Sequence, residues 1–205
     1  MKTFIENNTE ELFALIKELC AIPAPSHFEN DRAGYCKNWL ESIGAKEVYI
    51  DEALNVILPI NCTGRNKITV FVAHTDTVFP DQKPMPYIDD GKFIKSPGVG
   101  DDTAGLAVLL LTAKYFVQNN ILPQHGIMFV CNSCEEGLGN LKGTRQLFDN
   151  YSGRIAQFIS LDGIFPLIAD RCVGSHRYEV EVFTEGGHSY GAFGKKTPLL
   201  NLPEL

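Results

Sequence analysis

Long hydrophobic runs are missing from this sequence. The longest, residues 106–111, is far shorter than the roughly 20 apolar residues that a membrane helix needs. The N-terminal segment is polar, and its apolar residues are spaced as on one helix face rather than clustered as in a signal peptide. We therefore expect a chain that has no membrane partner and stays in the cytoplasm.

Positive charge is scarce as well. Lys and Arg number 18 against 25 Asp and Glu, which gives a formal net charge of −7. A nucleic-acid-binding domain carries a basic patch or stripe, so this balance predicts no nucleic-acid partner. Hydrophobic residues at 44% and charged residues at 21% are typical of a folded globular chain rather than a disordered one.

Paired cysteine motifs of the zinc-finger kind are also absent. Six cysteines without an export signal are typical of reduced thiols in a cytoplasm. Cys131 and Cys134 form a single CxxC motif, and no second pair or histidine pair follows at the spacing of a structural zinc site. We expect Cys131 to be a buried strand residue, with a redox pair as the alternative.

Hydrophobic periodicity predicts helices that alternate with short apolar strands. The predicted helices cover residues 9–20, with Thr9 as the N-cap, and 29–42, 102–118 and 141–150. The predicted strands cover residues 47–50, 55–60, 68–73, 126–131 and 157–161. The strand at 68–73 is almost entirely apolar, as expected of a strand buried on both faces. The pattern therefore predicts an α/β fold with a mostly parallel mixed sheet flanked by helices.

Two further segments interrupt this alternation. Residues 79–97 contain four prolines and predict a long irregular segment, which in many proteins is functional. Residues 168–184 alternate between apolar and polar side chains, with Tyr178, Val180 and Val182 on one side. This predicts an antiparallel strand and a change of architecture near residue 174.

Four short segments with acidic residues or histidine each follow an apolar run. They are residues 73–76, 100–102, 134–136 and 161–163. In open α/β sheets, ligands bind at the carboxyl ends of the strands. Carboxylates gathered around one imidazole repel one another unless a cation neutralises them. A pair of divalent metal ions is therefore the simplest explanation for this repeated pattern.

Each motif also has a simpler interpretation. His74 and Asp76 share one face of a strand, where Asp76 can hydrogen-bond the imidazole, or they form an ordinary polar turn. The acids of the glycine-rich segment 98–103 can simply cap the next helix, and the segment lacks the glycine order of a phosphate loop. Glu135 and Glu136 suit a split role, one on a metal and one as a base, or are solvated charge.

In their order along the chain, these motifs resemble the co-catalytic zinc peptidase family. That family includes peptidase T, carnosinase-type dipeptidases, aminoacylase, and the acetylornithine and succinyl-diaminopimelate deacylases. The resemblance runs from about residue 10 to residue 194 and looks closest to peptidase T-like members. It includes residues 186–189, which are similar to a motif early in the family's second, α+β lid or dimerisation domain.

The resemblance implies a role for each site residue. His74 would bind one zinc ion, Asp101 would bridge two, and Asp162 would complete the first set. Glu136 would bind the second zinc ion, Glu135 would be the general base and Asp76 would orient His74. His188 would stabilise the oxyanion, with a polar residue of a glycine-rich hairpin as its alternative. The implied cofactor is a pair of Zn²⁺ ions, although a carboxylate-rich site also accepts Mn²⁺ or Co²⁺.

The sequence departs from this family in two places. Thr103 stands where members usually have lysine, and the chain ends at Leu205, before the part that supplies a last histidine ligand. We therefore expect a catalytic domain over residues 1–173 without its C-terminal portion, and the beginning of a lid domain over 174–196. We expect residues 197–205 to be an aberrant tail, for which we hypothesise a frameshift, with a natural tail as the alternative. Residues 168–196 are a candidate homodimer contact.

Three functions stay open at this point. The first is metal-dependent hydrolysis of an amide bond in a small peptide or N-acyl amino acid, impaired by truncation. The second is a non-catalytic fragment of such an enzyme that binds at most one metal ion. The third is a Rossmann-like nucleotide-binding module, for which the glycine-rich segment at 98–105 is the only support.

Overall fold

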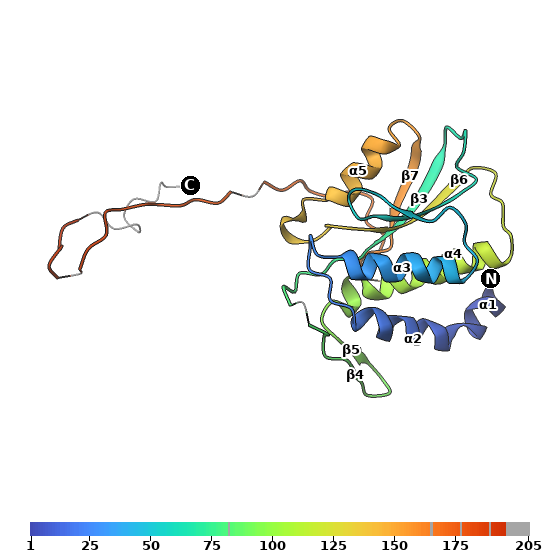
Figure 1. The fold of residues 1–205 in the computed structure, drawn as a ribbon, viewed down its shortest axis with the longest axis horizontal. Helices are drawn as coiled ribbons and strands as arrows, with labels where there is room; N and C mark the ends of the chain where they lie inside the picture. The colour runs from blue at the N-terminus through green and yellow to red at the C-terminus, as the bar shows by residue number, and fades with distance from the viewer. Residues whose placement is uncertain (82, 165, 177, 189, 196–205) are drawn as a thin grey trace. The chain divides into compact units, whose positions relative to one another are not determined.

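The computed structural model describes residues 1–81, 83–164, 166–176, 178–188 and 190–195. The chain divides into two units, Met1–Pro166 and Leu167–Leu205. The first unit contains every helix and strand that the structure describes (Figure 1). The expected aberrant tail at 197–205 lies outside the described residues. Within the described part, every helix is too short or too polar to cross a lipid bilayer.

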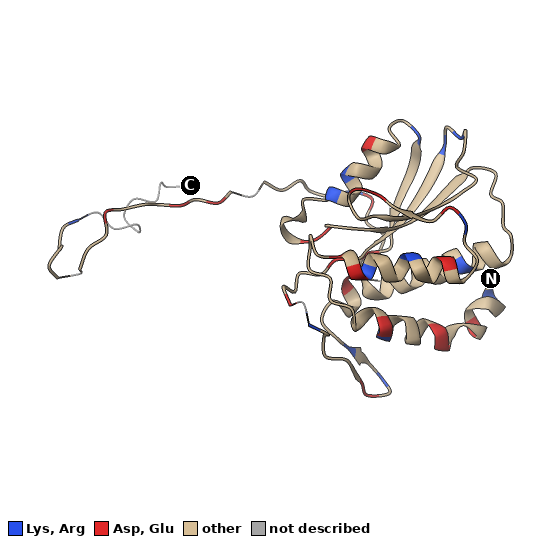
Figure 2. Cartoon of the chain, viewed as in Figure 1, with Lys and Arg blue, Asp and Glu red and all other residues tan. Residues whose placement is uncertain are grey.

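A five-stranded mixed sheet forms the centre of the first unit. Its order is β1 (Tyr49–Ile50), β2 (Val56–Ile60), β6 (Gly126–Asn132), β3 (Ile68–His74) and β7 (Ile155–Ser160). The strands β6, β3 and β7 run parallel, whereas β1 and β2 pair antiparallel. None of the five strands contains Lys, Arg, Asp or Glu, and all five are therefore tan in Figure 2. Such apolar strands suit a sheet covered on both faces.

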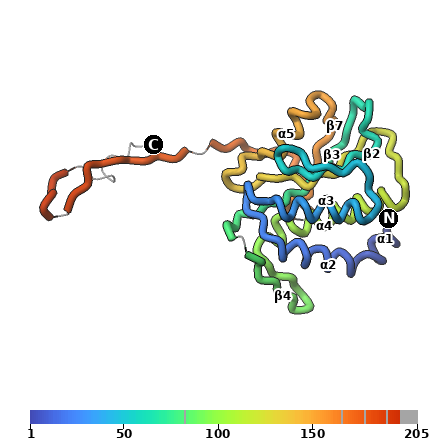
Figure 3. The backbone as a smooth tube through the Cα atoms, viewed as in Figure 1, coloured from blue at the N-terminus to red at the C-terminus, as the bar shows by residue number. Residues whose placement is uncertain are grey.

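Helices cover the two faces of the sheet unequally. One face packs against α2 (Thr9–Cys20), α3 (Asn30–Ser42) and α4 (Ala104–Gln118). The other face packs against Leu147 of α5 (Lys142–Asn150). Figure 3 shows α2, α3 and α4 together on one side and α5 on the other. Successive strand residues alternate between these layers: Leu58 faces the three helices, and Ile57 faces α5.

The parallel strands bring separated parts of the chain to one edge of the sheet. His74 at the end of β3 lies opposite Asn132 of β6, and Val72 lies opposite Ser160 of β7. The segments that follow these strands therefore leave the sheet at the same edge. The turn η1 (Val99–Thr103) before α4 also contacts β3. The predicted α/β class, with a mixed sheet between helices, is confirmed.

Several local predictions need correction. Thr9 lies inside α2, and Asn8 is its N-cap, because the preceding helix α1 (Lys2–Asn7) extends to this point. The irregular segment 79–97 contains a small hairpin of β4 (Ile88–Asp89) and β5 (Ile94–Lys95). The helix predicted from residue 102 begins at Ala104, because Asp101 and Asp102 have non-helical backbone angles. The short 3-10 turn η2 (Gly137–Gly139) precedes α5.

The antiparallel strand predicted over 168–184 is wrong for the residues described there. Residues 166–176 and 178–188 contain no strand. The alternating side chains are exposed instead, with Tyr178 and Phe183 each 86% accessible. A strand needs a neighbour for its backbone N–H and C=O groups, and alternation alone does not supply one. The assignment of 174–196 to a lid domain stays a prediction.

Candidate metal centre

Two groups of potential metal ligands meet at the edge where β3 and β6 end. The first consists of His74, Asp101 and Asp162, whose ligand atoms all lie within 4.8 Å of one another. The His74 Nε2 atom lies 2.9 Å from Asp101 Oδ1 and 4.0 Å from Asp162 Oδ2. His74 ends β3, Asp101 lies within η1, and Asp162 follows β7. The sheet thus brings together residues up to 88 positions apart in sequence.

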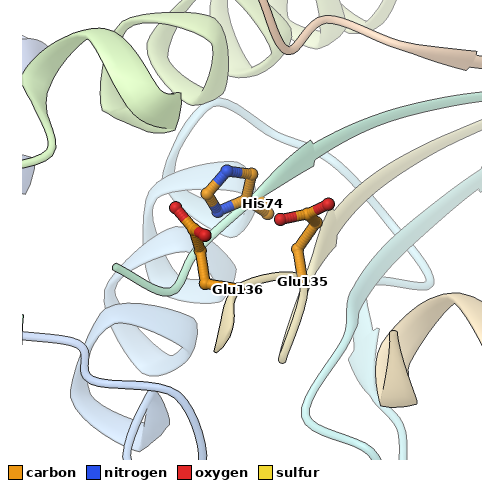
Figure 4. Close-up of side chains that lie close together, drawn as sticks. All are labelled: His74, Glu135 and Glu136. Carbon is orange, nitrogen blue, oxygen red and sulfur yellow. The ribbon is translucent and has the colours of Figure 1, made fainter. Parts of the chain in front are cut away.

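The second group consists of His74, Glu135 and Glu136, again within 4.8 Å of one another. Figure 4 shows the two carboxylates on either side of the imidazole ring, with both glutamates on the segment after β6. His74 belongs to both groups. Among the residues described, Asp101 and Glu136 do not occur together in either group. The bridging role of Asp101 and the role of each glutamate stay predictions.

The hydrogen bonds of His74 determine which nitrogen faces the carboxylates. Its Nδ1 atom donates to the main-chain carbonyl of Asp76 at 2.9 Å and lies 3.5 Å from the Asp76 carboxylate. The Nε2 atom is therefore the one available to a metal ion, with Nδ1 holding the ring in place. The ring itself is buried, at 2% exposure.

The charges around this imidazole fit a bound cation. Burial lowers the pKa of His74, but the hydrogen bond to Asp76 and the charge of Asp102 outweigh it and raise the pKa to about 10. Burial also raises the pKa of Glu135 and of Glu136. The site thus retains a proton among clustered carboxylates where a divalent cation can replace it. One imidazole with several carboxylate oxygens is a donor set suited to Zn²⁺, Mn²⁺ or Co²⁺.

Asp76 connects the two sequence motifs. Its side chain is completely buried, and its two carboxylate oxygens accept the main-chain N–H groups of Glu135 and Glu136, each at 2.9 Å. The Ser26 hydroxyl donates to the same carboxylate at 2.7 Å. Burial raises the pKa of Asp76, but these hydrogen bonds and the one with His74 lower it overall. Asp76 therefore contacts both the imidazole and the main chain of the glutamate pair, and its role in orienting His74 stays a prediction.

Sequence reasoning assigned no role to three groups near this centre, the buried Asp102 and Glu29 and the partly buried Ser26. Asp102 is only 2% exposed and accepts the main-chain N–H of His74 at 3.1 Å. Burial raises the pKa of Asp102 to about 7, against the opposing charge of His74. Glu29 and Ser26 contact the segment after β6. Asp102 was visible in the sequence as part of the acidic segment 100–102, with helix capping as the simpler interpretation, and Glu29 and Ser26 carried no signal there.

His188 belongs to the second unit. Its side chain is exposed, and its Nδ1 atom accepts the main-chain N–H groups of Tyr190 at 3.3 Å and Gly191 at 3.4 Å. These contacts are those of a polar residue in a glycine-rich turn. The predicted oxyanion role of His188 stays a prediction.

Comparison with known proteins places this chain among peptidases. The family model that matches residues 55–183 is the one for peptidase family M28. A curated relative, succinyl-diaminopimelate desuccinylase of Blochmanniella pennsylvanica, is 24% identical over 217 aligned positions, which cover 97% of this chain and 56% of the relative.

Solved structures share the fold. A tripeptidase from Staphylococcus aureus matches 75% of this chain and 43% of its own, with 24% identity and a TM-score of 0.59. The aminopeptidase PepT of Bacillus cereus matches 63% and 38%, with 25% identity and a TM-score of 0.51. A dinuclear metal binding peptidase of the M20 family from Bacillus subtilis matches 78% and 43%, with 16% identity and a TM-score of 0.53. The chain thus spans about half the length of these proteins.

Proposed function

Because this chain belongs to peptidase family M28, we propose that it carries the metal centre of a hydrolase that cleaves an amide bond in a small peptide or an N-acyl amino acid. The observation that carries this proposal is the meeting of two ligand groups on the single imidazole of His74. Because only Nε2 of His74 is free to bind a metal ion, His74 would serve one cation, and a second cation beside it would depend on the carboxylates. The relatives support both substrate classes, since one is a desuccinylase and others are a tripeptidase and an aminopeptidase.

The residues divide into ligands and a base. His74, Asp101 and Asp162 would hold one cation, with Asp101 shared, and Glu136 would hold the other. When bound, such cations lower the pKa of a shared water and polarise the substrate carbonyl. We propose Zn²⁺ as the natural metal, with Mn²⁺ or Co²⁺ as substitutes for the same donor set.

Glu135 is proposed to move the proton. Its carboxylate would take a proton from the attacking water and return it to the amine that leaves. Burial raises the pKa of Glu135, which brings the carboxylate closer to the proton affinity that a general base needs near neutral pH. The main-chain N–H of Glu135 donates to Asp76, and this hydrogen bond limits the positions that the Glu135 carboxylate can take.

A matched pair of variants tests these roles. We expect the unaltered chain to bind about two metal ions by elemental analysis and to hydrolyse tripeptides or N-succinyl amino acids. Glu135→Gln should keep the metal and lose turnover by a factor of about 10² to 10⁴, the range for a lost general base. Glu136→Gln should lose one metal ion. If Glu135→Gln also loses metal, Glu135 is a ligand rather than the base.

The other outcomes identify the rival functions. One metal ion or none, with no turnover of any tested amide, would identify a non-catalytic fragment. A melting temperature that rises with nucleotide but not with Zn²⁺ would instead support a nucleotide-binding module, since only a ligand of the folded state stabilises it.

A further inference from the structure

The segment that carries the two glutamates is held by side chains from distant parts of the chain. Each main-chain N–H group of residues 133–136 donates to a side-chain oxygen. The acceptors, in order, are Asn55 Oδ1 at 3.2 Å, Glu29 Oε1 at 2.9 Å, and the two oxygens of Asp76 at 2.9 Å each. Four consecutive N–H groups thus depend on side chains rather than on a strand or helix.

Glu29 is the acceptor without an assigned task. It is the N-cap residue of α3, yet its side chain makes no hydrogen bond to that helix. Instead its completely buried carboxyl group reaches Cys134, which is 105 positions away. It accepts both the main-chain N–H at 2.9 Å and the thiol of Cys134 at 3.3 Å. Helix capping therefore does not explain this residue.

The point that Glu29 holds is conformationally unusual. Cys134 has φ +53°, a left-handed conformation that is unfavourable for a residue with a Cβ atom. The residue needs an outside contact to stay in that conformation. Because Cys134 directly precedes Glu135, a change in its backbone angles would redirect both glutamate side chains away from His74.

The second oxygen of Glu29 argues against a role in stability alone. Within the described part of the chain, no group donates to Glu29 Oε2, although that atom is buried. A buried polar atom without a partner costs free energy. An apolar residue at this position would avoid that cost but could not hold the N–H group of Cys134.

We infer that Glu29 is a positioning residue that holds the turn at Cys134 and thereby keeps the carboxylates of Glu135 and Glu136 at the metal centre. Its consequence for catalysis rests on the proposed function. Its consequence for the conformation of residues 134–136 does not, and the two can be measured separately.

Amide hydrogen exchange measures the conformational part, with EDTA present so that no metal contributes. In Glu29→Ala, the N–H of Cys134 loses its acceptor directly, whereas those of Glu135 and Glu136 keep Asp76. We expect exchange at Glu135 and Glu136 to quicken as well, by about tenfold, because the whole turn loosens. Glu29→Gln retains an oxygen for the N–H of Cys134 and should exchange as the unaltered chain does.

Leu40→Ala is the matched control. Leu40 is a buried residue of the same helix, α3, and its loss destabilises that helix without removing an acceptor from residues 133–136. Its effect should spread over α3 and the sheet rather than concentrate at 134–136. If Glu29→Ala quickens exchange at Cys134 alone, or gives the same spread pattern as Leu40→Ala, the inference is wrong.

Zn²⁺ titration and kinetics measure the functional part. Glu29→Ala should weaken the metal site that includes Glu136 and lower kcat more than it changes KM, and Glu29→Gln should restore both. If the unaltered chain binds no second metal ion, the proposed function is contradicted. The hydrogen-exchange result then still tests the inference about Glu29. An unaltered form that binds two ions, with the same affinities and kcat in Glu29→Ala, contradicts the inference instead.

Discussion

At the scale of single residues, the centre contains more negative charge than its imidazole can neutralise. Asp102 is the clearest case, because it is buried beside His74 without being part of either ligand group. Its pKa of about 7 lies above the ordinary value of 3.8. Between these two values, Asp102 in the folded, metal-free protein therefore still binds a proton that it has already lost in the unfolded chain.

This difference gives Asp102 a pH-dependent effect on stability. A raised folded pKa means that stability is complete below about pH 4 and falls as the pH rises through about 7. We expect Asp102→Asn to unfold like the unaltered chain at pH 4 and to be more stable by roughly 2–4 kcal/mol at pH 8. Urea unfolding in EDTA at the two pH values measures this. Equal stabilities at pH 8 would contradict it.

At the scale of elements, α4 approaches the metal centre closely through a glycine. A Cβ atom on Gly105 would lie 1.9 Å from Asp102 Oδ1 and 2.9 Å from the main-chain oxygen of Leu161. Both neighbours adjoin candidate ligands, Asp101 and Asp162. The first turn of α4 thus fits against two ligand-bearing segments only because this position has no side chain.

Two glycine substitutions should act in opposite directions. Gly105→Ala should destabilise the protein by about 1–3 kcal/mol through overpacking and weaken metal binding at the His74–Asp101–Asp162 group. Gly34→Ala is the matched control, because this glycine of α3 has open space around its Cβ position. It should stabilise the protein by about 0.5–1 kcal/mol through helix propensity. Thermal unfolding and Zn²⁺ titration of both variants test this pair.

At the scale of the whole molecule, metal binding should couple to folding. The candidate ligands come from β3, η1, and the segments after β6 and β7, so they are close together only in the folded chain. Zn²⁺ at 100 times its dissociation constant should therefore stabilise the protein by about 2.7 kcal/mol, and EDTA should reverse the effect. His74→Ala should reduce it, because His74 supplies the imidazole ligand of the first proposed cation. A melting temperature that does not change with Zn²⁺ would contradict the proposed metal centre.

Self-association through residues 168–196 is a separate prediction at this scale. Apolar side chains in this stretch are exposed, among them Ile168 at 92% and Phe193 at 92%. Exposed apolar surface of this kind favours contact with another chain. We expect sedimentation velocity to show dimers or larger species, and Ile168→Lys with Phe193→Lys to shift the distribution toward the monomer. A monomer at all concentrations would exclude this contact.

The sequence by itself determined the elements and the residue types at their ends. Periodicity identified α2, α3 and the apolar strands, because the choice between helix and strand depends on residues a few positions apart. The motifs at His74, Asp101, Glu135 and Asp162 were visible because each adjoins a predicted strand or helix end.

Only the tertiary structure decided which groups meet. The order β1-β2-β6-β3-β7 does not follow the order along the chain, and it is this order that places β6 and β7 on either side of β3. Asp76 accepts hydrogen bonds from the main chain of both glutamates, and Glu29 accepts one from Cys134. These contacts join residues 59 to 105 positions apart. Such contacts depend on the packing of the whole sheet and its helices, and no local pattern of side chains encodes them.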